Sequence, residues 1–141
     1  MNIERLTELA EWLERGAPEQ KGVTKFDMGD FICLEEYKTH TDMWEKYKEG
    51  ALDEADSILR RCGTACCIAG AAVMFYSKHP ALSRLQYNEA DDGRDLLDLT
   101  AEQSNRLFFP RNLDLITPSW AARCIRKLIE TGEVDWAGTA K

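Results

Sequence analysis

Apolar residues recur every three or four positions at the start of the chain, and glutamates fill many of the positions between them. This spacing places the apolar residues on one face of a helix over residues 2–15. Asn2 is a suitable N-cap, and Gly16 followed by Pro18 marks the end of this helix. The apolar face consists of Ile3, Leu6, Leu9, Ala10 and Leu13.

A second segment is apolar on every side. Residues 65–75 read ACCIAGAAVMF, in which small side chains predominate. A helix of this kind lies in the middle of a core, where neighbouring helices approach it closely. We therefore predict a central buried helix over residues 64–77, ending before Pro80.

The pattern elsewhere predicts further helices. Residues 23–33 have no helical period and indicate a short extended segment or a poor hairpin. The other predicted elements are one bent helix or two consecutive helices over residues 41–61, a loop at Asp91-Asp92-Gly93, a short helix opened by a Thr100–Gln103 capping box and ended by Pro110, and a helix from Thr117-Pro118 to Gly132. The predicted fold class is all-α: a compact helical bundle of about five to six helices around the buried central helix, in a single domain over residues 1–141.

Length and charge narrow the classes of function. The chain has 141 residues, which suits one domain, and 25 acidic against 18 basic residues give it a net charge of −7. Direct binding to nucleic acid is disfavoured, because it needs dense Lys and Arg, whereas a partner protein with a basic surface is favoured. The longest uncharged run, Cys62 to Ser77, is shorter than the roughly 20 residues of a membrane helix. Five cysteines, an odd number, and a start without a signal segment predict a cytoplasmic protein away from membranes.

Acidic and aromatic residues supply a candidate partner-binding site. Asp91, Asp92 and Asp95 crowd one segment, but placing Gly93 at the sixth position of an EF-hand loop puts unsuitable residues at the ligand positions. These acids form either a solvated surface or a docking patch. Aromatic residues among charges, as at Trp44 or at the Trp120–Trp136 pair, are typical of interface anchors and also of helices packed on a core. The candidate partner-binding residues are Glu35, Glu36, Asp91, Asp92, Asp95, Trp44 and Tyr47.

Cysteines at the start of the predicted central helix supply a candidate ligand site. Free N–H groups at a helix start favour a thiolate at Cys66 or Cys67, or an anion such as a nucleotide phosphate at Thr64. A nucleophilic thiol would need a base, and His40 and His79 stand in no recognisable Cys/His pattern. The alternative is that the cysteines are small apolar core residues and Thr64 only caps the helix. The candidate ligand residues are Gly63, Thr64, Cys66 and Cys67, with no metal ion and no cofactor predicted.

Three segments together carry a resemblance to a known group of proteins. They are Cys62-Gly63-Thr64-Ala65-Cys66-Cys67-Ile68-Ala69-Gly70, then Leu97-Asp98-Leu99-Thr100-Ala101-Glu102-Gln103 with Leu107-Phe108-Phe109-Pro110, and Ile116-Thr117-Pro118 with Ala121-Ala122-Arg123. The set resembles small proteins of unassigned function, encoded by phages, prophages and their bacterial hosts. These share C-G-T-x-x-C-x-x-G and L-x-L-T…L-F-x-P segments. The likeness covers about half of the chain and departs at Ala71, where such proteins often have tryptophan. It implies a phage context, in which small accessory proteins commonly bind a host protein.

The sequence therefore predicts a non-enzymatic acidic binding protein, encoded by a phage, in the cytoplasm of the host cell. We expect it to dock on a host protein with a basic surface, such as a defence complex or a nuclease, and to inhibit or redirect it. Pairing with a second copy of the chain stays open. The alternative function is a protein that binds a nucleotide or a metal, or a thiol enzyme, at the Cys62–Cys67 segment.

Overall fold

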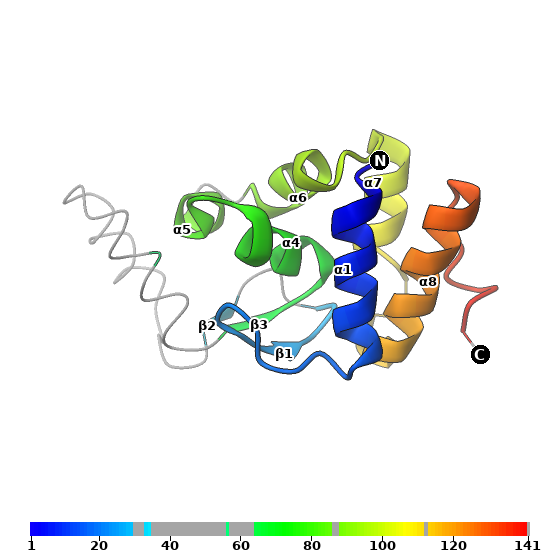
Figure 1. The fold of residues 1–141 in the computed structure, drawn as a ribbon, viewed down its shortest axis with the longest axis horizontal. Coiled ribbons are helices and arrows are strands. Elements are labelled where there is room, and N and C mark those ends of the chain that lie inside the picture. Colours follow the sequence, from blue (N-terminus) through cyan, green and yellow to red (C-terminus); the bar gives the residue numbers. More distant parts are fainter. Residues whose placement is uncertain (30–32, 35–55, 57–63, 86–87, 112, 141) are drawn as a thin grey trace.

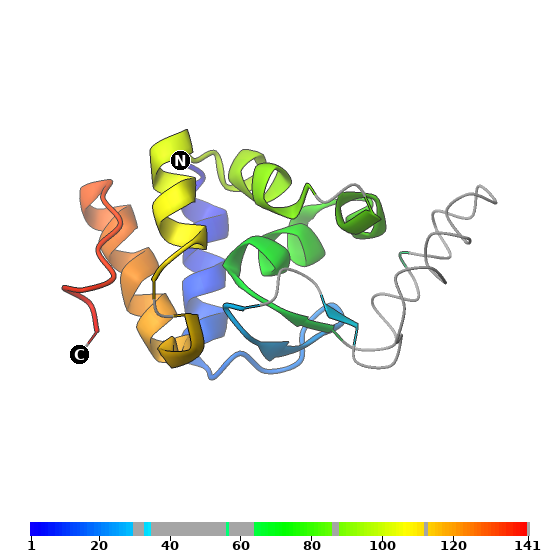
Figure 2. The same ribbon diagram turned by 180° about the vertical axis from the view of Figure 1, so that it is seen from behind.

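Most of the described chain is helical, as predicted (Figures 1 and 2). The computed structural model describes residues 1–29, 33–34, 56, 64–85, 88–111 and 113–140. The helices are α1 (Ile3–Glu14), α4 (Ile68–Tyr76), α5 (Pro80–Leu85), α6 (Glu89–Leu97), α7 (Ala101–Phe108) and α8 (Pro118–Thr131), with a 3-10 turn η1 (Leu113–Leu115) before α8. None of these described helices has the length and apolar composition needed to cross a membrane.

A small sheet accompanies the helices, and the sequence did not predict it. Its strands among the described residues are β1 (Val23–Phe26), β2 (Cys33–Leu34) and β3 (Thr64–Cys66). The middle strand is β3, which is parallel to β1 and antiparallel to β2. The extended conformation predicted within residues 23–33 is thus present in β1, but its pairing with a strand about 40 residues later could not be inferred from local pattern.

The helix predicted from residue 64 begins four residues later. Thr64–Cys66 forms β3, Cys67 has an extended backbone with φ −82° and ψ −171°, and α4 starts at Ile68. The prediction was wrong for residues 64–67 because a short apolar run has the same pattern in a buried strand as in a helix. Residues 68–76 are helical, and every residue from Ile68 to Phe75 is buried.

The predicted loop at Asp91-Asp92-Gly93 is also wrong, because these residues form the middle of α6. Gly93 is buried where α6 crosses α4, and a Cβ atom at this position would lie 3.2 Å from the Cα and the carbonyl oxygen of Ala69. The glycine therefore permits a close approach of two helices rather than a turn.

The ends of α1, α7 and α8 follow the predicted capping residues. The Asn2 side chain accepts the Arg5 N–H at 3.1 Å, and Thr117 accepts the Trp120 N–H at 3.2 Å. Thr100 and Gln103 form a complete capping box at α7. Gly132 ends α8 with a positive φ of 77°. These caps depend on neighbours in sequence, which is why the sequence predicted them.

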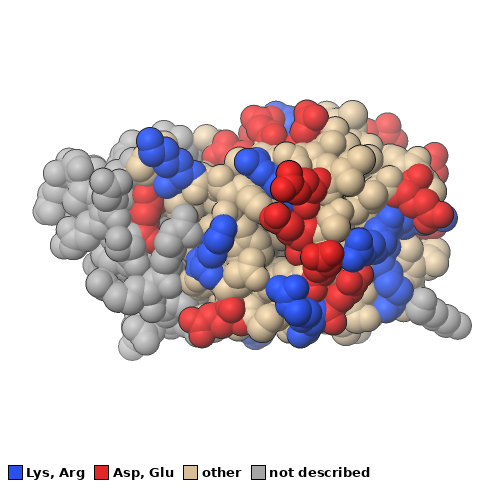
Figure 3. All heavy atoms as spheres, in the orientation of Figure 1, with Lys and Arg blue, Asp and Glu red and all other residues tan. Residues whose placement is uncertain are grey.

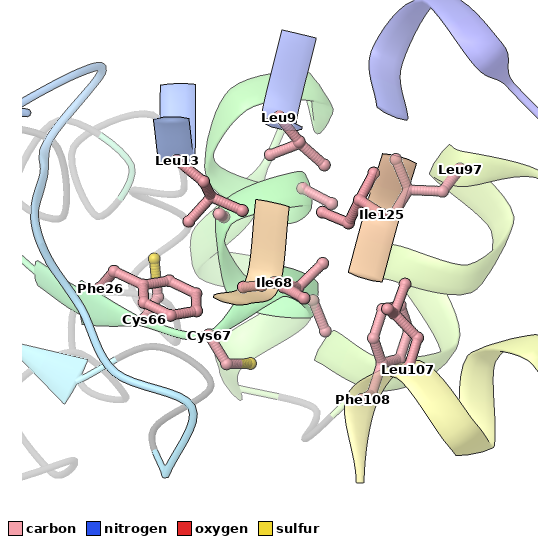
Figure 4. Packing of buried hydrophobic residues seen from close by; sticks show 14 of the residues in the cluster. Leu9, Leu13, Phe26, Cys66, Cys67, Ile68, Leu97, Leu107, Phe108 and Ile125 are labelled. Atoms are coloured by element: carbon pink, nitrogen blue, oxygen red, sulfur yellow. The ribbon is translucent and has the colours of Figure 1, made fainter. Parts of the chain in front are cut away.

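The core lies where α1, α4 and α8 meet beside the sheet (Figure 4). Trp12 of α1 is fully buried, and its indole makes edge contacts with Phe75, at 5.0 Å between ring centroids, and with Phe26, at 6.3 Å. Its Nε1–H donates to the Pro18 carbonyl at 2.7 Å. One aromatic side chain thus joins α1, α4, β1 and the loop after α1.

Candidate functional site

The two described cysteines of the candidate ligand site are buried. Cys66 ends β3 and Cys67 precedes α4, and Figure 4 shows both side chains beside Phe26 and Ile68 in the core. Thr64 lies in β3, so the N-cap position of α4 belongs to Cys67 rather than to Thr64. Gly63 lies outside the described residues.

Burial makes the Cys67 thiol a weak acid. Desolvation raises its pKa to about 12, although backbone N–H groups of Gly70 and Ala69 act in the opposite direction. Cys124 of α8 is buried as well, and desolvation again raises its pKa to about 12. Since the nucleophile and metal ligand is the thiolate, these environments favour cysteines that pack as small apolar groups.

Some of the candidate partner-binding residues lie outside the described part of the chain, and the others lie on α6. Glu35, Glu36, Trp44 and Tyr47 lie outside the described residues, as does His40. On α6, the side chains of Asp91 and Asp95 are 71% and 72% exposed, and Arg94 lies within 3.8 Å of the first and 3.3 Å of the second. Asp92 instead accepts the Ser83 hydroxyl at 2.5 Å and joins α6 to α5.

This surface carries both signs of charge. Figure 3 shows acidic and basic side chains interleaved across one face of the molecule. Arg94 offsets part of the charge of Asp91 and Asp95, so the exposed face of α6 is only mildly acidic. It can attract a basic partner at long range, but ion pairs this exposed contribute little binding energy.

A hollow of about 610 Å³ lies between the end of α7, the start of α8 and the C-terminal segment. That segment follows Gly132 and turns back beside α8, as Figures 1 and 2 show. The apolar lining includes Phe109, Pro110, Ile116, Trp120, Val134 and Trp136, and the charged lining residues are Arg106, Arg111 and Asp135. Its volume is typical of a site that holds a ligand or an inserted segment.

The two indoles of the hollow are held in fixed positions. Trp120 and Trp136 meet edge to face, with ring centroids 5.9 Å apart. The Nε1–H of Trp120 donates to the Trp136 carbonyl at 2.9 Å, and the Nε1–H of Trp136 donates to the Arg106 carbonyl at 2.8 Å. Because both N–H groups already have acceptors, the rings offer apolar surface at a small further cost in side-chain entropy.

Arg123 fastens the C-terminal segment that forms one wall. Its guanidinium donates to the Thr139 carbonyl at 2.8 Å, to the Ala140 carbonyl at 3.1 Å and to the Ser119 hydroxyl at 2.7 Å. The Thr139 hydroxyl in turn donates to the Asp135 carbonyl at 2.6 Å. The wall of the hollow is therefore tied to α8 by several hydrogen bonds.

The sequence pointed to only part of this hollow. It raised an interface for Trp120 and Trp136, but it gave no role to Phe109, whose side chain is 53% exposed. A usable signal was the run Leu107-Phe108-Phe109 before Pro110, because the last turn of a helix cannot bury three consecutive large side chains on one face. The structure buries the first two and leaves the third at the hollow.

A second hollow of about 420 Å³ lies between α5 and α6 and includes His79 and Asp92 in its lining. The Nδ1 atom of His79 lies 2.7 Å from Oδ2 of Asp56, and Oδ1 of the same carboxylate accepts the Ala81 N–H at 2.9 Å. Asp56 therefore accepts a backbone N–H at the start of α5. The sequence pattern did not predict this contact, because the two residues are far apart along the chain.

No protein-family model, curated protein or solved structure matches this chain. The described residues also contain no group of three or more His, Cys, Asp or Glu side chains placed to hold a metal ion. The resemblance to phage-encoded proteins therefore stays a prediction from the motifs.

Proposed function

We propose that this protein is a non-enzymatic binding protein that docks on another protein and uses the hollow between α7 and α8 as its anchor point. The observation that carries this proposal is the pair of fixed indoles, Trp120 and Trp136, in a hollow of about 610 Å³. Protein interfaces obtain most of their binding energy from a few large side chains in preformed hollows of this kind.

The surface beside the hollow favours a protein as the partner. Phe109 is 53% exposed at its edge, and Leu115 in the turn before α8 is 69% exposed. Large apolar side chains at this exposure become favourable contacts when a partner covers them, at about 25 cal/mol for each Å² of apolar surface removed from water.

The exposed acids of α6 form the second part of the proposal. Asp91 and Asp95 would speed the encounter with a host protein that has a basic surface, and the chain's net charge of −7 acts in the same direction. Following the resemblance stated above, we propose a phage-encoded protein that acts in the host cytoplasm on a defence complex or a nuclease.

The architecture that we propose with this function is a single domain, residues 1–141, with α4 as its central helix. The burial of every residue from Ile68 to Phe75 supports it. The buried cysteines then belong to this core, and we propose neither a metal ion nor a cofactor for the activity.

Native mass spectrometry of the protein purified from its own host, with partners retained, tests the function. We expect a host protein at fixed stoichiometry. Phe109→Ser should lose this protein, whereas Ile3→Ser, which changes an apolar residue of the same 53% exposure on α1, should keep it. A chain that carries no protein, or a partner that both variants keep equally, would contradict a docking function at the hollow.

A further inference from the structure

We infer that the hollow between α7 and α8 accepts an acidic peptide segment with one aromatic or leucine-like side chain as its anchor. This inference rests on the proposed function and specifies the chemistry of the partner segment at that site. Two observations carry it: the sign of the charges around the hollow, and the shape of its apolar lining.

The charge around the hollow is opposite to that of the chain. The whole chain has a net charge of −7, yet the charged residues that line the hollow within the described part of the chain are two arginines and one aspartate. Asp135 already uses one carboxylate oxygen to accept the Gly138 N–H at 2.8 Å. The local charge thus favours an anionic group on the ligand.

The two arginines are available to such a group. Arg106 is 60% exposed and lies 3.9 Å from Glu102, which is a weak pairing. Arg111 is exposed and has no ion pair within the part of the chain that the structure describes. Guanidinium groups bind carboxylates with two parallel hydrogen bonds, so each arginine can hold one acidic side chain.

The apolar lining defines the anchor. Trp120, Trp136 and Phe109 present ring surfaces, and Ile116 and Val134 are buried at the same place. Aromatic rings prefer edge-to-face or offset neighbours, and leucine packs well on their faces. The volume exceeds that of one such side chain, so the hollow has room for the anchor and for parts of the residues beside it.

A peptide fits these observations better than a small molecule does. Phe109, which is 53% exposed, lines the hollow together with both arginines, and Leu115, which is 69% exposed, directly precedes the lining residue Ile116 in the sequence. An extended segment with acids on both sides of an anchor residue can cover this surface and reach Arg106 and Arg111 together.

Fluorescence anisotropy with four labelled hexapeptides tests the inference. Two peptides carry a central phenylalanine flanked by aspartates or by lysines, and two carry alanine in place of the phenylalanine. We expect the aspartate–phenylalanine peptide to bind at least about tenfold more tightly than the other three, with an affinity that falls as salt rises. Arg111→Glu should weaken it about tenfold or more. Lys25→Glu, which makes the same reversal of charge at an exposed residue of β1, should leave the affinity for this peptide unchanged.

The other outcomes separate the inference from the proposed function. Equal binding of the lysine peptide, or equal loss in Lys25→Glu, would overturn the acidic segment. Phenylpropionate that binds as tightly as the peptide would also overturn it in favour of a small-molecule site. If no peptide binds while Phe109→Ser still loses the host protein, the ligand chemistry is wrong and the function stands. If the acidic peptide binds but no host protein is found, the site stands and the function is wrong.

Discussion

Two regions of this protein differ in how far their side chains are exposed to solvent. The Cys66–Gly70 segment has the more distinctive sequence, and the structure buries it between β1 and α6. The hollow between α7 and α8 is built from ordinary residues and leaves aromatic rings open to solvent. The comparison shows that a distinctive sequence can result from close packing, whereas a hollow with exposed aromatic rings is assembled from separate stretches of the chain.

The largest expected effect is the loss of core packing at α4. Ile68→Ala removes a buried side chain that touches the core on all sides, and it should lower the free energy of unfolding by about 2–5 kcal/mol. The control Ile3→Ala, at the exposed first residue of α1, should change it by about 0.5 kcal/mol or less. Urea unfolding followed by circular dichroism measures both, and equal losses would contradict the proposal that α4 is the central helix.

A smaller loss is expected where α6 crosses α4. An alanine in a helix is ordinarily more stable than a glycine by about 1 kcal/mol. Gly93→Ala should instead lower the free energy of unfolding, by about 1–3 kcal/mol, because the new methyl group meets the backbone of Ala69. The control Asn105→Ala, at an exposed position of α7, should raise the free energy of unfolding slightly, as alanine ordinarily does in a helix. If Gly93→Ala raised the stability, α4 and α6 would have to lie further apart than they do in the structure.

The buried thiol of Cys67 should make the protein sensitive to alkaline pH. Its folded pKa of about 12 lies above the ordinary value, so between about pH 9 and 12 the unfolded chain loses a proton that the folded chain keeps. The free energy of unfolding should therefore fall with rising pH by about 1.4 kcal/mol per pH unit for this thiol.

The Cys67→Ala variant isolates this contribution from the lysines and tyrosines that titrate in the same range. Urea titrations from pH 8 to 11 should show a shallower fall for the variant than for the parent protein. Iodoacetamide should label Cys67 only when the chain unfolds. Identical slopes, together with fast labelling of the native protein, would restore the thiol-site alternative.

The smallest effect on stability is expected at the hollow. Phe109→Ser should change the free energy of unfolding by about 0.5 kcal/mol or less, because the ring is half exposed and lies beyond the last turn of α7. The same urea titration measures it. A loss comparable to that of Ile68→Ala would show that Phe109 is a core residue, and that the binding defect expected for this variant reports unfolding.

The agreement between sequence and structure follows the range of each interaction. The caps at Asn2, Thr100 and Thr117 join residues three positions apart, so the local pattern was sufficient. The strand at Thr64–Cys66 depends on partners about 30 to 40 residues away, and its apolar residues suit a helix equally well. Gly93 was assigned to a loop because the sequence does not show that α4 packs against this position and leaves no room for a side chain.

The candidate sites show the same division. The sequence placed cysteines at a helix start, but their burial and the raised pKa of Cys67 depend on elements from the whole chain. It raised an interface at Trp120 and Trp136 without their companions, because Phe109 and Arg106 come from another helix. Asp91 and Asp95 are exposed as expected, yet Arg94 beside them reduces the charge they present.

By itself the sequence determined the helical character, the caps of α1, α7 and α8, and the apolar face of α1 except for the exposed Ile3 and the buried Trp12. These features depend on periodicity and on neighbours within one turn. The tertiary structure alone decided that Thr64–Cys66 joins a sheet, that Cys67 is desolvated, and that α7, α8 and the returning C-terminal segment enclose a hollow. The physical reason is that burial, desolvation and concave surfaces arise from surfaces meeting across the chain, which no short stretch of sequence contains.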